Sequence, residues 1–327
     1  MRMLRRVLLL GAAGMLAATS GACSSDDASG DTRGGEIHGA DVWKDGLVVT
    51  GALTIAKDGN VEIAPGAKIT VAEGALIRVE GSLTARAAAS HATIRAERWQ
   101  GIIVAAGAKL DLEGVDLENT ARAIGTAPDA QESRFAEGAI LNSMQPFVIS
   151  KGSKLALTNV KITTPAKGSQ ADVEGSLVAK RIDYDAFASE GLSVRPGGEL
   201  DLEDSVIHGE NGADLISAYG AKRVRLAYST FKGSHCGIHI EPSESFEIDH
   251  VTSESVYGIT IYGSGAGPNI VRASNITGGS AWLDFAGQNG AITFDNVFAT
   301  GSEILKGGPI PPTISKASAP IADAKPR

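Results

Sequence analysis

The chain has 327 residues, of which 40 are glycine and only 5% are aromatic, and it carries 38 acidic against 30 basic residues for a formal net charge of −8. This acidic balance, without a basic cluster in the body of the chain, argues against nucleic acid as a partner. The length would ordinarily suggest about two domains, but an array of repeats can extend as one unit.

Residues 1–22 have the organisation of a bacterial export signal. Three arginines lie within the first six residues, the apolar run that follows is too short to span a membrane, and small residues precede Cys23. The end of this segment resembles a lipobox, and that resemblance implies that Cys23 is lipidated. Ser20 departs from the aliphatic residue that a lipobox prefers. Simple cleavage after Ala22, which would give a secreted protein, is the alternative.

A lipid on Cys23 would make the membrane a partner of the chain. Ser24 and Ser25 do not form the inner-membrane retention signal that an aspartate would give, so we expect sorting to the outer membrane. Cys236 would then have no intramolecular disulfide partner, and we interpret it as a small core or turn residue. Residues 23–36 are polar and are predicted to form a flexible tether, whereas the Pro/Ala-rich residues 307–327 are predicted to form a disordered tail.

The body of the chain repeats at a fixed spacing. GIIVAAGAKLDLEGVDLENT at residue 101 returns as PFVISKGSKLALTNVKITTP at 146 and as GLSVRPGGELDLEDSVIHGE at 191, in steps of 45 residues. Apolar residues alternate with polar ones over three to five positions, and Gly, Asn, Asp or Ser interrupts each run. Such alternation predicts short strands with one buried face and a corner after each strand.

The spacing shortens in the second half of the chain. Ile238 to Ile259 is 21 residues, Ile259 to Leu283 is 24, and Leu283 to Ile304 is 21. One coil of about 22 residues with three short strands is a parallel β-helix, and the 45-residue step then makes two coils. Antiparallel sandwiches and barrels do not require one spacing to recur along the chain. We therefore predict an all-β fold, a right-handed parallel β-helix of about a dozen turns over residues 37–306.

Stacked coils predict where particular residues lie. Gly107, Gly152 and Gly197 should share one corner, where φ is positive. Asn275 and Asn296 are candidates for a ladder at another corner. The Trp43 region and the residues after Leu305 are the candidates for the two caps that an open solenoid needs.

Two stretches carry a family resemblance. GALTIAKDGNVEIAPGAKITVAEGALIRVEGSLTA at 51–85, followed by WQGIIV at 99, resembles the opening coils of bacterial β-helix proteins of the pectin-lyase-like superfamily, and GIHI and GITI resemble its later coils. That superfamily includes pectate lyases, polygalacturonases, alginate epimerases and surface proteins without known activity, so the resemblance implies a fold rather than a reaction. The motifs of its hydrolases and epimerases are missing; Gly233–Gly237 is the nearest approach to one of them.

The strand alternation predicts one face with functional character. With Ile238 and Ile240 inward, His239 and Glu241 point outward, and their equivalents in neighbouring coils form two rows. The first row contains Ser193, Ser217, His239, Thr260 and Asp284, and the second contains Arg195, Tyr219, Glu241 and Tyr262. Tyrosine rings, an imidazole, carboxylates and a guanidinium suit a glycan. An ordinary solvated polar face is the simpler interpretation.

Two functional hypotheses follow. The first is a noncatalytic envelope lipoprotein whose β-helix is a scaffold or binds a polysaccharide or a partner protein of the envelope. The second is a polysaccharide lyase, hydrolase or epimerase that acts on the same face. His235, His239 and His250 do not have the compact spacing of zinc ligands, so the sequence predicts neither a metal nor a cofactor.

Overall fold

The computed structural model describes residues 31–187, 190–210, 214–241, 243–265, 267–287, 290–307 and 310–327. The signal segment, Cys23 and most of the predicted tether lie outside these residues. Residues 31–327 form one compact unit. Every regular element in the described part of the chain is a β-strand, and none of its segments forms an apolar helix of membrane-spanning length.

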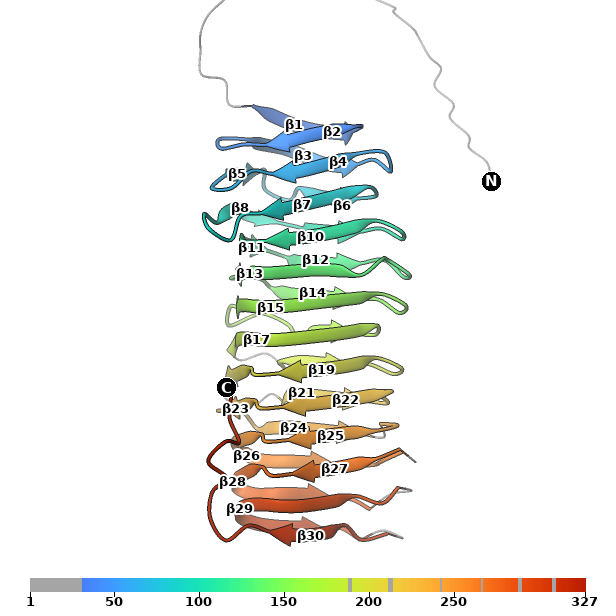
Figure 1. Cartoon of the computed structure of the whole chain (residues 1–327), viewed down its shortest axis with the longest axis vertical. Helices are drawn as coiled ribbons and strands as arrows, with labels where there is room; N and C mark the ends of the chain where they lie inside the picture. The colour runs from blue at the N-terminus through green and yellow to red at the C-terminus, as the bar shows by residue number, and fades with distance from the viewer. Residues whose placement is uncertain are drawn as a thin grey trace, which may run out of the picture. The chain divides into compact units, whose positions relative to one another are not determined.

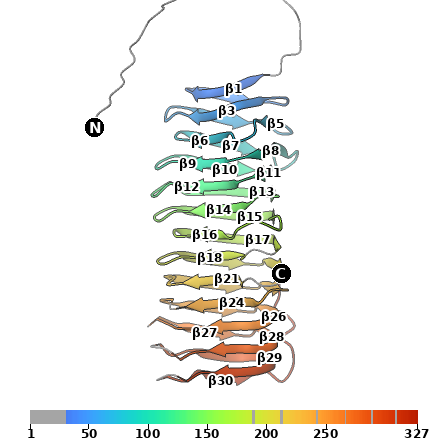
Figure 2. The same cartoon turned by 180° about the vertical axis from the view of Figure 1, so that it is seen from behind.

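This unit is a right-handed parallel β-helix of about 12 turns, as the repeat predicts. Each coil contributes strands to three parallel sheets, which we call faces 1, 2 and 3 in the order in which the chain meets them. Figure 1 is viewed onto face 2, where the strands run from right to left, and Figure 2 is viewed onto face 1. All pairings between neighbouring coils are parallel, which excludes the sandwich and barrel alternatives.

Most strands belong to one face. Face 1 contains β6 (Leu76–Val79), β9 (Gly101–Val104), β12 (Arg122–Thr126), β14 (Gln145–Ile149), β16 (Ala171–Val173), β18 (Leu192–Val194), β21 (Asp214–Tyr219) and β24 (Cys236–Glu241). Face 2 contains β2 (Ala40–Trp43), β4 (Asn60–Ile63), β7 (Ser82–Arg86), β10 (Lys109–Glu113), β19 (Glu199–Glu203), β22 (Arg223–Ala227), β25 (Phe246–Asp249), β27 (Asn269–Arg272) and β30 (Thr313–Lys316). Face 3 contains β5 (Lys68–Val71), β8 (Ala92–Trp99), β11 (Val115–Thr120), β20 (Val206–Gly209) and β23 (Thr230–Lys232).

The remaining strands are long enough to turn a corner and serve two or three faces. They are β1 (Thr32–Ile37), β3 (Val48–Ile55), β13 (Ser133–Leu141), β15 (Lys154–Thr163), β17 (Ser176–Phe187), β26 (Thr252–Ile261), β28 (Asn275–Phe285) and β29 (Thr293–Leu305). In the second half of the chain, β26, β28 and β29 complete face 1 beyond β24.

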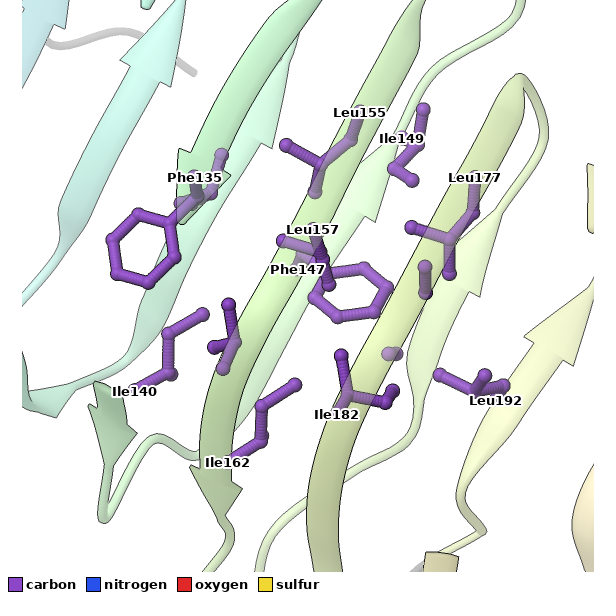
Figure 3. Close-up of a cluster of buried hydrophobic side chains, with 14 of the residues drawn as sticks. Phe135, Ile140, Phe147, Ile149, Leu155, Leu157, Ile162, Leu177, Ile182 and Leu192 are labelled. Atoms are coloured by element: carbon purple, nitrogen blue, oxygen red, sulfur yellow. The ribbon is translucent and has the colours of Figure 1, made fainter. Parts of the chain in front are cut away.

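Aliphatic columns fill the interior of the coils. Leu155 pairs with Leu177 and Leu177 pairs with Leu200, so 45 residues do make two coils. All three leucines are at most 1% exposed. Figure 3 shows Leu155 and Leu177 on neighbouring coils, with Phe147 from face 1 turned into the same interior. Burying a side chain of this size contributes about 1.5–3 kcal/mol, and the columns repeat this contribution at every coil.

Two register predictions were wrong near the C-terminal end. Leu283 pairs with Glu303, and Ile304 pairs with Asp284, because irregularities between β28 and β29 shift the register by one residue. Asn275 and Asn296 do not stack, since Asn275 pairs with Phe298. In the first case, irregular pairing after Thr277 shifts the register. In the second, the pairing is regular, but the coil is two residues longer than the spacing of Asn275 and Asn296, since Arg272 pairs with Asp295 and Asn275 with Phe298.

The corners use backbone conformations with positive φ. Gly107, Gly152 and Gly197 have φ of 75°, 78° and 80°, which confirms their shared corner between faces 1 and 2. The corner between faces 2 and 3 instead holds mostly non-glycine residues in the left-handed region, namely Glu137, Asn159, Arg181, Asp204, Tyr228, His250, Ala273 and Asn296. None of these is β-branched, as the steric cost of this conformation requires.

Both ends of the chain differ from their sequence-based interpretation. Residues 32–36 of the expected tether, together with Ile37, form β1 and pair with β3. The expected disordered tail is ordered over residues 310–327, because β30 pairs with β29 and covers the last coil. Residues 317–327, which we call the strap, then run back along the corner between faces 2 and 3 (Figure 1).

Polar contacts hold the strap in place. The backbone N–H of Ile321 donates to Asn275 Oδ1 at 2.7 Å, and Asn275 Nδ2 donates to the carbonyl of Ile321 at 2.9 Å. Arg327 donates to Asp204 Oδ1 at 3.0 Å, and its guanidinium lies 3.9 Å from the ring centroid of Tyr228. The strap therefore ties the last coil to the corner that follows β19.

Replacing Asn275 with alanine should release the strap. The change removes both amide hydrogen bonds to Ile321, each of which contributes about 0.5–1.5 kcal/mol. We expect trypsin to cut after Lys316 about tenfold faster than in the unaltered chain, since cleavage follows the population of the open form. Asn60→Ala, at an exposed position of β4 far from the strap, is the control. Equal cleavage rates for both variants would contradict this role of Asn275.

Candidate functional site

The two predicted rows exist on face 1 with the predicted register. Ser193 pairs with Ser217, Ser217 with His239, His239 with Thr260, and Thr260 with Asp284. Tyr219 pairs with Glu241. Arg195 holds the equivalent position one coil before Tyr219, and Tyr262 holds it one coil after Glu241. We call these nine residues the polar strip.

The first row is not solvated as expected. Ser193 and Ser217 are fully buried, Thr260 is 3% exposed and Asp284 is 6% exposed. The side chain of His239 is 14% exposed, whereas that of Glu241 is 38% exposed. The first row of the strip is therefore largely buried, and the second row beside it is more accessible. An ordinary solvated face does not describe the first row.

His239 occupies the centre of the strip. Its Nδ1 lies 2.7 Å from Asp214 Oδ2, and its Nε2 lies 3.2 Å from Glu241 Oε1 in an orientation that makes no hydrogen bond. Burial alone would lower the pKa of His239, but the hydrogen bond and charge of Asp214, with the charge of Glu241, outweigh it and raise the pKa above its ordinary value.

Two tyrosine rings enclose this imidazole. The ring centroids of Tyr219 and Tyr262 lie 5.7 Å and 5.6 Å from that of His239, both edge-on. Burial and the negative charges of Asp214 and Glu190 raise the pKa of Tyr219 to about 12, so its hydroxyl keeps its proton and remains a donor. The three rings form a continuous ridge across three coils.

A cation lies at each end of the strip, and each is paired with an acid. Arg195 Nη2 lies 2.7 Å from Asp172 Oδ1, one coil back. Lys306 Nζ donates to Tyr262 Oη at 2.7 Å and to Asp284 Oδ2 at 3.1 Å, and the hydroxyl of Tyr262 also donates to Asp284. The ends of the strip are therefore fixed by ion pairs.

Glu190 adds a second acid beside Asp214. Ser217 Oγ donates to Glu190 Oε2 at 3.5 Å. Burial, and then the charge of Asp214, raise the pKa of the Glu190 carboxyl above its ordinary value. This residue precedes β18, and the alternation of apolar and polar residues gave no indication of it.

Cys236 lies next to Asp214, with which it pairs on the neighbouring coil. Its Sγ is 3.5 Å from Thr260 Oγ1 and 3.4 Å from His235 Nδ1, and the residue is 4% exposed. Burial raises the pKa of the thiol to about 12, which makes it a poor nucleophile, in line with its interpretation as a small buried residue.

Sequence reasoning missed Asp214, although a signal for it existed. Asp214 precedes Ser217 by three residues, as Cys236 precedes His239, and the structure pairs Asp214 with Cys236. Extending the pairing of these two strands three residues toward their N-terminal ends would have placed Asp214 next to Cys236.

Face 2 offers a contrast to the strip. Its outward side chains form ion pairs between neighbouring coils, such as Arg225 with Asp201 at 2.7 Å and Arg272 with Glu247 at 2.8 Å. These partners are all more than a quarter exposed. A self-neutralising ladder of this kind contributes little to stability and presents no aromatic surface to a ligand.

A groove lies at the corner between faces 3 and 1, just before β24 and within β26 and β28. It has a volume of about 760 Å³ and is lined by residues 233–235, 254–256 and 277–279. His235 packs against Tyr257 there, with ring centroids 5.0 Å apart. The groove thus reaches His235, the residue before Cys236.

Comparisons with known proteins add the following. No protein-family model matches the chain, and no curated protein matches it. The solved structure of endopolygalacturonase I from Stereum purpureum has 10% identity and a TM-score of 0.32, and the match covers 86% of this chain and 99% of that one. The catalytic unit of a GH87 α-1,3-glucanase from Streptomyces thermodiastaticus has 10% identity and a TM-score of 0.27, with 88% of this chain and 63% of that one covered.

The electrostatics of the strip can be tested on His239. Asp214→Asn removes the carboxylate that raises the pKa of His239, so we expect that pKa to fall in a histidine NMR titration with chelator present. Asp183→Asn, next to His208 on face 3, should leave the pKa of His239 unchanged. A pKa of His239 that stays the same in Asp214→Asn would show that Asp214 does not control it.

Proposed function

We propose that the polar strip of face 1 binds a polysaccharide without cleaving it, and that a lipid on Cys23 holds the protein at the outer membrane. The proposed polysaccharide binding rests on the row of three rings, Tyr219, His239 and Tyr262, which lies beside carboxylates that can accept hydrogen bonds. Aromatic rings present an apolar surface with a polar edge, which suits the faces of sugar rings, and carboxylates accept hydrogen bonds from sugar hydroxyls.

The strip is organised before any ligand arrives. Asp214 holds His239, Asp284 and Lys306 hold Tyr262, and Asp172 holds Arg195. Side chains that are already fixed lose little conformational entropy on binding, so more of the contact energy contributes to affinity. Five coil steps separate Asp172 from Asp284, about 24 Å at the spacing of β-strands, which is long enough for several sugar units of an extended chain.

The charge of the strip favours a neutral glycan. The carboxylates in or beside the strip are those of Asp172, Glu190, Asp214, Glu241 and Asp284. The cations are Arg195 in the strip and Lys306 beside it, and both are ion-paired. A polyuronate would bring further negative charge to this surface and would be repelled. We therefore propose a neutral polysaccharide rather than a uronate-rich one.

The proposed anchor rests on the sequence before the described residues. Three acyl chains on Cys23 would hold the protein firmly, since each buried CH₂ contributes about 0.8 kcal/mol. The solenoid would then display the strip at the cell envelope, where polysaccharides are abundant partners. Secretion after plain cleavage at Ala22 is the alternative for localisation.

One observation favours the catalytic alternative. Glu190 lies beside Asp214 and has a raised pKa, and a carboxyl group that keeps its proton next to a second carboxyl group can act as a general acid. A polysaccharide lyase, hydrolase or epimerase acting at this strip would need such a pair. The assay below therefore measures product as well as binding.

A glycan panel tests the proposed binding. The full chain carrying Cys23→Ser should bind a neutral polysaccharide more tightly than a uronate polymer, and no new reducing or unsaturated ends should form. Tyr262→Ala and Arg195→Ala should each weaken binding about tenfold, equivalent to about 1.4 kcal/mol of lost contact. Binding is measured by titration calorimetry or affinity electrophoresis.

The controls separate the strip from the rest of the surface. Arg225→Ala on face 2 removes an arginine whose pairing to Asp201 matches that of Arg195 to Asp172, and it should leave binding unchanged. Turnover that Glu190→Gln abolishes would establish the catalytic alternative. Binding that survives both strip variants would refute the strip as the binding surface.

The anchor has its own test. In a Gram-negative host, the unaltered chain should incorporate labelled palmitate and partition into detergent, because acyl chains add apolar surface. Cys23→Ser should abolish both, whereas Cys236→Ser should abolish neither. Equal labelling of the unaltered chain and Cys23→Ser would exclude lipidation at this cysteine.

A further inference from the structure

We infer that Asp214, Cys236 and His239 form a binding site for a zinc-class divalent transition metal. The ligand atoms of these three side chains, a carboxylate oxygen, Sγ and a ring nitrogen, all lie within 4.8 Å of one another. The sequence predicted no metal, because the three residues are brought together by the stacking of β21 on β24 and not by a compact spacing.

The donor set selects the kind of metal. Thiolate, imidazole and carboxylate are the three ligand types that Zn²⁺ takes in proteins, whereas Ca²⁺ and Mg²⁺ prefer oxygen ligands. Four-coordinate Zn²⁺ with bonds of about 2.0–2.3 Å holds its ligand atoms about 3.3–3.8 Å apart. The observed separations, from 2.7 Å between Asp214 and His239 to at most 4.8 Å, bracket this value, so small side-chain rotations suffice.

The surroundings of the three residues fit a cation. Glu241 Oε1 lies 3.2 Å from His239 Nε2. The two make no hydrogen bond in this orientation, but a small rotation of the Glu241 carboxylate would let it accept the Nε2 proton and orient a metal-binding imidazole through Nδ1. Glu190 contributes a further carboxyl near Asp214. The cation of the strip nearest to Glu190, Arg195, is engaged by Asp172, so an excess of negative charge remains at the site.

Proton balance is simple. As the metal binds, the thiol of Cys236 releases its proton to solvent and Sγ ligates as the thiolate. His239 ligates through Nδ1 as a neutral ring with its one proton on Nε2, so a doubly protonated ring also releases one proton to solvent. No oxidant or co-reactant is needed. With three protein ligands, one position remains for water or for an oxygen of a bound molecule.

The site is nearly enclosed but accessible. Cys236 is 4% exposed, and the side chains of Asp214 and His239 are each 14% exposed. A metal can therefore enter from the surface of face 1 and still be shielded enough for strong binding. The inference does not depend on the proposed polysaccharide, because a metal titration needs no glycan.

Cobalt provides the direct test. The full chain carrying Cys23→Ser keeps Cys236 as its single thiol, since the chain has two cysteines. After treatment with chelator, Co²⁺ should bind at one equivalent per chain and produce a thiolate-to-cobalt charge-transfer absorption, which added Zn²⁺ should remove. Asp214→Asn and His239→Gln should each weaken binding at least a hundredfold, Cys236→Ser should abolish the charge-transfer absorption, and Glu241→Gln should weaken binding about 10- to 100-fold.

His208→Gln removes a histidine that lies near two aspartates on face 3, and it should leave cobalt binding unchanged. Far-UV circular dichroism confirms that each variant is folded, and the milder Glu241→Gln keeps the test valid if a ligand variant fails to fold. A spectrum without thiolate absorption, or equal loss of binding in His208→Gln, would overturn the inference.

Discussion

Every feature of this molecule depends on one constraint: a side chain of one coil must lie directly on its equivalent in the next. Inside, this stacks leucine on leucine, as in Leu155, Leu177 and Leu200, and leaves little space for water. Outside, the same register places polar residues in rows that run along the helix. Because the backbone hydrogen bonds join successive coils, the inner and outer rows shift together when the register changes, and a slip of one residue exchanges the two.

The polar strip is a consequence of this constraint rather than of any local motif. Within each row, neighbouring residues are about 22 positions apart in the sequence and come from successive coils. A site of this kind gains one side chain per coil, so its length can exceed that of any single loop. It also explains why Asp172, His239 and Lys306, which lie far apart in the sequence, belong to one surface.

The sequence predicted the architecture and the rows because aliphatic stacking leaves a periodic trace. It did not predict which outward residues are buried, since the cover over Ser217 and Asp284 comes from neighbouring coils and not from alternation within the strand. Asp214 and Glu190 were missed because they lie at or beyond the ends of strands, where alternation stops. The order of the strap was missed because polar and backbone contacts, such as those of Asn275 and Asp204, hold it and leave no apolar pattern.

The last coils are prone to fraying because they lie at an open end of the solenoid, yet they must hold a buried outer row of polar residues in place. The terminal strand of a solenoid exposes unpaired backbone groups, and fraying there would move β28 and β29. These strands carry Asp284 and precede Lys306, which fix Tyr262 in the ridge. By tying β30 back to the corner after β19, the strap resists such fraying over the coils that contribute the ridge. The stability of the C-terminal coils and the organisation of the strip therefore depend on the same few contacts, although these contacts lie on the opposite side of the coil from the strip.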